Sequence, residues 1–196
     1  MNAFQTVRTT LVLAFNNLPM LLVPFIGFLA IGLGNIGLFM LFLGHVFVIP
    51  AVVWIAQKFM GSGIGYELPS PSYWLTQVLF FFSYVITNAA TLNGLPKSRR
   101  MTEWLYENRK SKTVAVMTVA ILMALVLTVL RYMTGYETVV GVLLAAVLAG
   151  GIGYGWHALA GICGARYADV FGMVSQMLPA SAKEEKPMAC IYTAKP

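Results

Sequence analysis

Residues Arg131 to Gly155 read RYMTGYETVVGVLLAAVLAGGIGYG and join the end of one apolar segment to the start of the next. Arg131 ends the first segment and, after five intervening residues, Glu137 opens the second. The second segment is rich in glycine and alanine, which remove side-chain bulk and let a neighbouring helix approach closely. We therefore expect the face from Ala145 to Gly155 to pack against another helix, with Gly151 at the contact.

The composition is typical of a membrane protein. Of the 196 residues, 59% are hydrophobic and only 10% are charged, whereas a soluble domain carries about 25% charged residues. The formal net charge is +6, but most basic residues flank apolar segments, where membrane surfaces select them, so nucleic-acid binding is not expected. Two cysteines and two histidines predict neither a disulfide framework nor a metal site.

Five apolar segments are each long enough to cross a membrane, because roughly 20 helical residues span the hydrocarbon core. They run over residues 10–31, 36–57, 73–92, 113–133 and 138–162. A tight turn at 32–35 makes the first two an antiparallel hairpin. We predict an all-α transmembrane bundle over 1–162 and an amphipathic, polar C-terminal tail over 163–196. An apolar piece of that tail, 170–178, either lies on the membrane surface or folds back.

The loop charges predict an orientation in the membrane. The basic stretch 94–113 is expected on the cytoplasmic side, with a short interfacial helix over 101–108. The C-terminal tail then shares that side. The N-terminus, the loop 58–72 and the turn 131–137 lie on the opposite, lumenal or external side. Two helix starts and the end of the second span therefore converge there.

Polar and charged residues gather at this convergence. Ser72 is expected to cap the helix that begins at Tyr73, and the free N–H groups of a helix start favour an anion. Lys58 and Arg131 bring two cations from other segments. The pattern predicts an anion or lipid head group site formed by Lys58, Ser72 and Arg131. Two alternatives stay open: basic residues at helix ends reach toward the membrane surface, or Arg131 pairs with Glu137 for structural reasons alone.

The order and spacing of these residues resemble the phosphatidic acid phosphatase type 2 superfamily of lipid phosphatases. That family carries K-x6-R-P at the end of one span, P-S-G-H at the start of the next, and S-R-x5-H-x3-D across its last two. Lys58 stands at the first lysine, although no R-P follows, and Pro-Ser-Tyr-Trp at 71–74 stands at the second motif. Arg131 and Glu137 stand at the arginine and histidine of the third, with Gly141 at its acid position.

The resemblance covers roughly residues 50–155 and implies a bundle of six spans, of which these five would be the last. Enzymes of the superfamily use the histidines of the second and third motifs as proton partner and nucleophile, and here Trp74 and Glu137 replace them. No catalytic residue is therefore predicted. His45 and His157 lie inside apolar segments, where we expect hydrogen bonding between helices, although a functional role for such groups stays open. The remnant motif positions are Lys58, Ser72, Trp74, Arg131 and Glu137.

These observations predict a non-catalytic, phosphatidic acid phosphatase-like integral membrane protein that binds a lipid head group or forms part of a membrane assembly. Its partners would be membrane lipids, anionic ones included, and protein chains or copies of itself, with no cofactor. The motif at 71–74 together with residues 163–172 also resembles phosphatase-like proteins of large DNA viruses, which implies a virion internal membrane. Two alternatives remain: an active phosphatase acting on phosphatidic acid or a lipid diphosphate, and a small transporter or channel subunit.

Overall fold

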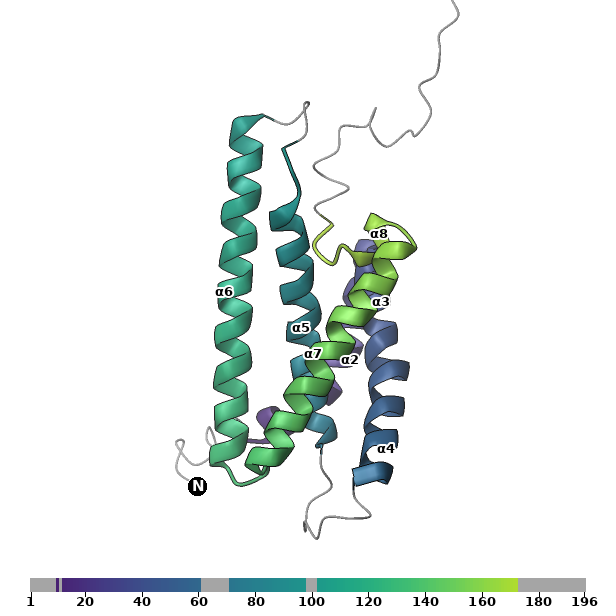
Figure 1. Ribbon diagram of the computed structural model, residues 1–196, viewed down its shortest axis with the longest axis vertical. Coiled ribbons are helices and arrows are strands. Elements are labelled where there is room, and N and C mark those ends of the chain that lie inside the picture. Colours follow the sequence, from purple (N-terminus) through teal and green to yellow (C-terminus); the bar gives the residue numbers. More distant parts are fainter. Residues whose placement is uncertain (1–9, 11, 61–70, 98–101, 173–196) are drawn as a thin grey trace, which may run out of the picture.

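The chain folds into a bundle of helices, seen in the computed structural model of Figure 1. The structure describes residues 10, 12–60, 71–97 and 102–172, and within these ranges no element is a strand. The all-α prediction is therefore confirmed. Among the described residues, four helices are long and apolar enough to cross a membrane: Ile36–Phe59, Tyr73–Gly94, Glu103–Met133 and Val139–Ile162.

The arrangement centres on one helix, α5, which packs against both α6 and α7. In Figure 1, α6 ends and α7 begins at a common turn at the lower end, and the two helices diverge toward the upper end, with α5 against both. The labelled elements are α2 (Leu18–Leu33), α3 (Ile36–Leu43), the π-helical turn η1 (Gly44–Val48), α4 (Ile49–Met60), α5 (Tyr73–Gly94), α6 (Glu103–Met133), α7 (Val139–Ile162) and α8 (Ala165–Ala168).

The first predicted span is interrupted near its start. Asn17, with φ −95° and ψ 7°, forms a turn between the helical residues that precede it and α2. Pro19 lies in the first turn of α2, where its missing N–H loses no helical hydrogen bond, so a new helix begins there. With 16 residues, α2 falls short of the roughly 20 that cross the hydrocarbon core. The predicted span over 10–31 is therefore interrupted at Asn17, and a fifth span stays a prediction.

The hairpin predicted at residues 32–35 is confirmed. Gly34 has a φ of +58°, a left-handed conformation that favours glycine. Asn35 caps α3 by accepting a hydrogen bond from the Leu38 N–H at 3.1 Å. Its amide nitrogen also donates to the Val170 carbonyl oxygen at 2.9 Å, which ties the segment after α8 to the start of α3.

The described part of the C-terminal tail packs onto the bundle. Val170 is 7% exposed and belongs to the same core as Ile26 and Leu41. Gly37 lies so near this segment that a Cβ on it would stand 2.3 Å from the Asp169 carbonyl oxygen. Folding back, one of the two alternatives for residues 170–178, therefore holds for 170–172. The rest of that piece lies outside the described residues.

One continuous helix, α6, replaces the two elements expected between the third and fifth predicted spans. It begins at Glu103 and is capped by Thr102, whose hydroxyl oxygen accepts from the Leu105 N–H at 3.3 Å. No glycine or proline separates the expected surface helix from the expected span, so nothing in the backbone ends the helix between them. A separate helix over 101–108 is therefore wrong, and the helix that contains the predicted span 113–133 begins earlier, at Glu103.

The small residues of α7 pack against α5 along a single face. At Gly153 the approach is closest, since a Cβ there would stand 2.6 Å from Ser83 Oγ and 3.2 Å from the Tyr84 nitrogen. By contrast, nothing lies within 4 Å of a Cβ built on Gly151. The close contact predicted at Gly151 is therefore wrong, and Gly153 makes it instead. The buried positions of α7 are Gly141, Ala145, Ala149, Gly153, His157 and Ala160.

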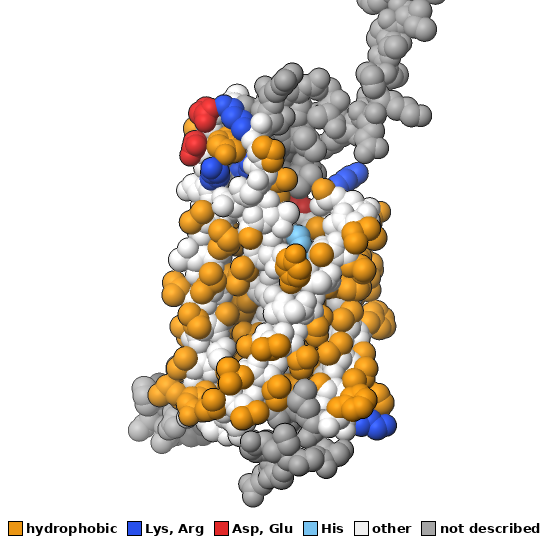
Figure 2. Space-filling view, viewed as in Figure 1, with side chains coloured by type: hydrophobic (Ala, Val, Ile, Leu, Met, Phe, Trp, Pro, Cys, Tyr) orange, Lys and Arg blue, Asp and Glu red, His pale blue; other side chains and the backbone are white. Residues whose placement is uncertain are grey.

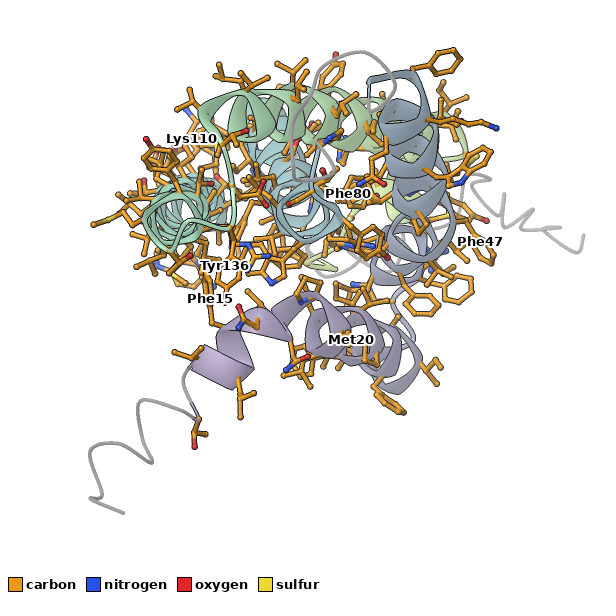
Figure 3. All side chains as sticks on the ribbon, turned by 90° about the horizontal axis from the view of Figure 1, so that it is seen from below. Phe15, Met20, Phe47, Phe80, Lys110 and Tyr136 are labelled. Carbon is orange, nitrogen blue, oxygen red and sulfur yellow. The ribbon has the colours of Figure 1, made fainter. Side chains whose placement is uncertain are left out.

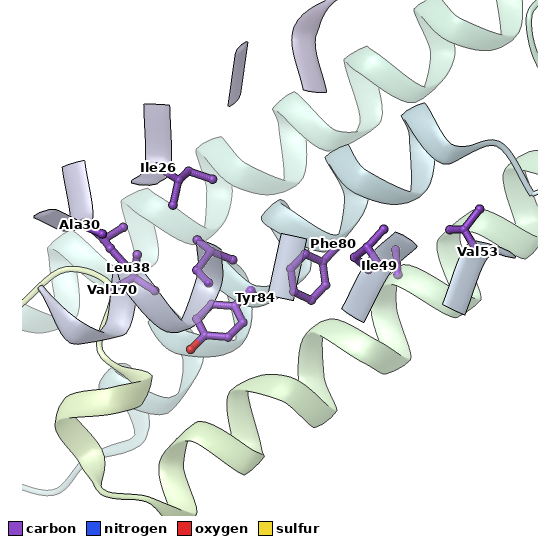
Figure 4. Close-up of a cluster of buried hydrophobic side chains, with 10 residues drawn as sticks. Ile26, Ala30, Leu38, Ile49, Val53, Phe80, Tyr84 and Val170 are labelled. Atoms are coloured by element: carbon purple, nitrogen blue, oxygen red, sulfur yellow. The ribbon is translucent and has the colours of Figure 1, made fainter. Parts of the chain in front are cut away.

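A second part of the core joins α5 to the first half of the chain. In Figure 4, Phe80 and Tyr84 of α5 lie among apolar side chains from α2, α3 and α4. Both aromatic residues are 0% exposed. This core fixes α5 against the hairpin and so positions the helix starts described below. The core residues on the other helices are Ile26, Ala30, Leu38, Leu41, Ile49 and Val53.

The outer surface is apolar over its middle part. Figure 2 shows orange side chains covering the body of the bundle, while charged side chains gather over the start of α6. Only 11% of the apolar window of α6 is buried within the protein, so most of that helix is available to lipid. A wide apolar band with charges beyond it suits a hydrocarbon core bounded by polar surfaces.

Candidate functional site

The start of α5 is fixed by hydrogen bonds on both sides. Ser72 has an extended backbone, and its Oγ accepts from the Leu75 N–H at 3.2 Å. The predicted N-cap is therefore confirmed. Gln57, near the end of α4, donates from Nε2 to the Pro71 carbonyl oxygen at 2.8 Å. The convergence of these two helix ends, expected from the topology, is thus present in the fold.

The turn between α6 and α7 brings Arg131 and Glu137 together. Gly135 adopts a φ of +75° within this turn, and Thr138 caps α7 by accepting from the Gly141 N–H at 3.0 Å. The Nε of Arg131 lies 3.7 Å from Oε1 of Glu137, and the two side chains are 13% and 4% exposed. The ion pair that the sequence left open is therefore present and largely buried.

The Arg131 guanidinium is also held by residues from other helices. Its Cζ lies 4.7 Å from the centre of the Trp74 ring and 4.4 Å from that of Tyr136, which are cation–π distances. Its Nη1 donates to Asn16 Oδ1 at 3.3 Å. Phe15 and Tyr136, labelled in Figure 3, are remote in sequence and lie near each other here. We define the Arg131 cluster as Asn16, Trp74, Arg131, Tyr136 and Glu137.

Trp74 connects this cluster to the first helical residues. Its indole Nε1 donates to the Phe15 carbonyl oxygen at 3.1 Å, and the two rings lie 4.9 Å apart between centroids. Trp74, which the motif resemblance would align with a histidine, is 7% exposed. An indole N–H donates but has no basic nitrogen to accept a proton. Its role in this geometry is therefore to cover Arg131 and to hold the chain before α2.

The Glu137 carboxyl group is subject to opposing influences. Burial raises its pKa above the ordinary value, and this effect outweighs the hydrogen bond from Ser72 and the charge of Arg131, which both lower the pKa. Ser72 thus contacts Glu137 as well as capping α5. It links the start of α5 to the α6–α7 turn, as the predicted site required.

Lys58 lies in the last turn of α4 with an exposed side chain. Its ammonium nitrogen stands 5.0 Å from the centre of the Trp54 ring, which is 63% exposed. This placement is typical of a lysine that reaches along its own helix toward the membrane surface. Of the three residues predicted to hold an anion, Ser72 and Arg131 are therefore brought together through Glu137, while Lys58 lies against Trp54 of its own helix.

A cavity of about 500 Å³ lies beside the Arg131 cluster, between α2 on one side and η1 and α5 on the other. Two members of the cluster, Asn16 and Trp74, form part of its wall. Sequence reasoning missed this cavity, because α2 and α5 are remote in sequence and their spacing is set by packing. The lining residues are Asn16, Pro19, Met20, Val23, Pro24, His45, Val46, Tyr73, Trp74 and Gln77.

A polar network lies along the wall of this cavity. His45, in η1, is 0% exposed, and its Nδ1 bonds to Oε1 of Gln77. The Gln77 amide nitrogen donates to the His45 carbonyl oxygen at 3.0 Å and to the Tyr73 hydroxyl oxygen at 2.6 Å. The interhelical hydrogen bonding expected of His45 is confirmed. Gln77 was noticeable in the sequence as an amide within an apolar segment.

His157 lies at the opposite end of the bundle from the Arg131 cluster, on the last part of α7. Its ring is 5.2 Å from that of Tyr84. It lines a second cavity of about 340 Å³ with Asn88 and Asp169. Within the described residues, no three His, Cys, Asp or Glu side chains lie close enough to hold a metal ion.

Comparison with known proteins found no relative of this chain. No family model matches the chain, and no curated protein or solved structure matches it either. The resemblance to lipid phosphatases therefore rests on the motif residues alone. What the site can do is argued below from its own geometry.

Proposed function

We propose that this protein is a non-catalytic integral membrane protein that holds one membrane amphiphile in the cavity between α2 and α5. The observation that carries this proposal is that the cavity and the Arg131 cluster share Asn16 and Trp74. A lipid in the cavity would therefore lie beside a charged site. The resemblance supports the same function, because Ser72 and Arg131 stand where the phosphatase superfamily holds phosphate.

The distribution of polarity along the cavity suits an amphiphile. Asn16 precedes α2 and Tyr73 begins α5, at the end of the bundle where a membrane surface is expected. Val23, Pro24 and Val46 line the part farther from that end. A polar head group near the surface and a hydrocarbon chain beyond it match this order. The volume of about 500 Å³ lies within the range of about 300–1,000 Å³ typical of small-molecule sites.

Filling the cavity should displace the bound lipid. We expect purified protein to retain one lipid per chain in native mass spectrometry, and we expect Val23→Trp to lose it, because the indole occupies the space between α2 and α5. Leu21→Trp is the matched control, since Leu21 lies on the same helix and is 58% exposed. Equal lipid retention by both variants would contradict the proposed site.

The residues of the site support binding without hydrolysis. Neither remnant histidine position holds a histidine, His45 is bonded to Gln77, and His157 lies against Tyr84. Glu137, at the nucleophile position, is engaged by Arg131 and Ser72. A carboxylate held by a cation and a hydroxyl group is a weaker nucleophile than a free one.

We therefore expect no phosphate release from phosphatidic acid or a lipid diphosphate above the background of protein-free vesicles. The measurement is inorganic phosphate after prolonged incubation, with Glu137→Gln tested in parallel. Release that disappears in Glu137→Gln would make Glu137 a nucleophile and the protein an active phosphatase. Release by both proteins would also contradict the proposal, and it would show that a group other than Glu137 carries out the hydrolysis.

The cellular setting is part of the proposal. A cytoplasmic C-terminus, a lumenal or external N-terminus and a virion internal membrane follow from the loop charges and the viral resemblance. The broad exposed face of α6 is consistent with a membrane assembly in which this lipid-holding protein contacts partner chains or copies of itself.

A transporter is less favoured, because the cavity adjoins one end of the bundle and no internal repeat is visible in the sequence.

A further inference from the structure

The second cavity, which Asn88, His157 and Asp169 line, contains polar side chains that the fold leaves without hydrogen bonds. Asn88 is 2% exposed and His157 is 5% exposed. The amide nitrogen of Asn88 and Nε2 of His157 are enclosed and have no hydrogen-bond partner. The amide oxygen of Asn88 and Nδ1 of His157 also make no hydrogen bond within the described residues, but they are not enclosed. These two atoms are therefore the ones through which each side chain can meet a ligand in the cavity.

Two threonines of α5 add acceptors to the same wall. Thr87 and Thr91 flank Asn88 at helical spacing, so the three side chains share one face of the helix. The hydroxyl group of Thr87 donates to the Ser83 carbonyl oxygen at 2.8 Å, and that of Thr91 donates to the Thr87 carbonyl oxygen at 2.9 Å. A hydroxyl group carries a single proton. Each threonine oxygen can therefore only accept a further hydrogen bond.

The charge of the wall disfavours an anion. Among the described residues that line the second cavity, none is a lysine or an arginine, and the charged one is Asp169. Its Oδ1 accepts from the Phe171 N–H at 3.1 Å, and a carboxylate can accept several hydrogen bonds. A ligand that matches this wall must supply donors. An ammonium group does so, because it has three N–H donors and no acceptor.

The second cavity lies toward one end of the bundle, where a membrane surface is expected. The last parts of α5 and α7 form its walls together with residues of α8. The start of α6 lies at the same end, and charged side chains gather there (Figures 1 and 2). Leu95 and Tyr154 belong to the wall and are 40% and 65% exposed, and tyrosine is frequent at membrane surfaces. A lipid head group can therefore enter from the side of the bundle.

From these observations we infer that the second cavity binds the primary ammonium group of an ethanolamine phospholipid. Its N–H groups donate to the Asn88 amide oxygen, Thr91 Oγ1 and His157 Nδ1. A choline head group has the same charge but no N–H group, so it would leave these acceptors without donors. This site is separate from the cavity between α2 and α5 and goes beyond the proposed function.

Phosphatidylethanolamine and phosphatidylcholine with identical acyl chains separate the donors from the charge. Protein labelled with ¹⁵N-histidine is placed in nanodiscs in which one lipid progressively replaces the other, and His157→Phe assigns the resonances. We expect the Nδ1 resonance of His157 to shift with phosphatidylethanolamine. The dependence on composition should give a preference on the order of 5-fold, the contribution of one net hydrogen bond.

Variants on α5 test the acceptors. Thr91→Val keeps the side-chain shape and removes one acceptor, so the preference should fall toward equal binding of the two lipids, and Asn88→Leu should abolish it. Thr118→Val is the matched control, because its hydroxyl group makes the same kind of bond, to the Val114 carbonyl oxygen at 3.0 Å, on the exposed surface of α6. The control should keep the wild-type preference.

A second pair of probes needs no variant. Tetradecylammonium and tetradecyltrimethylammonium, each added to nanodiscs of phosphatidylcholine, have the same charge and chain length. The first should reproduce the shift of the His157 resonance and the second should not. Equal shifts with both probes, or a resonance that ignores the lipid composition, would overturn the inference. A lipid preference that Thr91→Val and Asn88→Leu both leave unchanged would also overturn it.

Discussion

Arg131→Ala is expected to lower the free energy of unfolding by about 3–5 kcal/mol, because it leaves the Glu137 carboxylate buried without its cation. Glu137 is 4% exposed and Arg131 is 13% exposed, so water replaces little of the lost interaction. The variant also removes the contacts of the guanidinium with Trp74 and Tyr136, each contributing about 0.5–2 kcal/mol. Unfolding in one detergent, followed by heat or by SDS titration, measures the loss.

Two controls separate the ion pair from a general effect of removing arginine. Arg166→Ala changes an exposed arginine of α8 and should alter stability by about 0.5 kcal/mol or less. The double variant Arg131→Met with Glu137→Gln removes both charges while keeping side-chain volume. It should recover most of the loss, because no buried charge is left unpaired. A loss in Arg131→Ala no larger than in Arg166→Ala would show that the pair does not hold the turn.

The same variants test whether Arg131 also contacts a head group. Glu137→Gln removes the negative charge beside Arg131, so the share of anionic lipid in the retained fraction should rise. Arg131→Met should lower the share of anionic lipid in the retained fraction if the guanidinium contacts a phosphate group. Unchanged lipid ratios in both variants would leave Arg131 and Glu137 with a structural role alone.

Gly153→Leu is expected to destabilise the bundle by about 1–3 kcal/mol through overpacking. A Cβ at Gly153 would already stand 2.6 Å from Ser83 Oγ and 2.7 Å from Ser83 Cβ, so α5 and α7 must separate to admit a larger side chain. That movement also weakens the bond from Ser83 Oγ to the Gly150 carbonyl oxygen, now 3.2 Å. The thermal midpoint in detergent should fall accordingly.

Gly151→Leu is the matched control on the same helix. Nothing lies within 4 Å of a Cβ at Gly151, so the new side chain enters the surrounding lipid or detergent and stability should change little. Equal losses in Gly151→Leu and Gly153→Leu would mean that α7 presents both faces to protein, as it would in a tight oligomer.

Local chemistry in the sequence accounts for much of the secondary structure and for part of the site. Ser72 and Thr138 cap helices where side-chain hydroxyls suit that position. Gly34 ends α2 because glycine accepts its positive φ. Arg131 and Glu137 meet because a short turn leaves them little room to separate. These features depend on residues within a few positions of one another, so the sequence alone predicts them.

Span boundaries were less well predicted, because length and hydropathy say little about where a helix is interrupted. Asn17 ends the first helical stretch inside an apolar segment, and α6 continues through the polar residues before Thr113. Pro19 marks only the start of α2, and no glycine or proline marks a boundary before Thr113.

The sequence by itself determined an all-α apolar chain, the Ser72 cap and the first hairpin, and it offered the pairing of Arg131 with Glu137 as one of two alternatives. Only the tertiary structure decided which face of α7 packs, that Asn16 and Trp74 enclose Arg131, and that His45 lines a cavity. The physical reason lies in the membrane. A helix that is apolar all round shows no amphipathic stripe to mark its buried side, so its rotation follows from close contacts between helices remote in sequence.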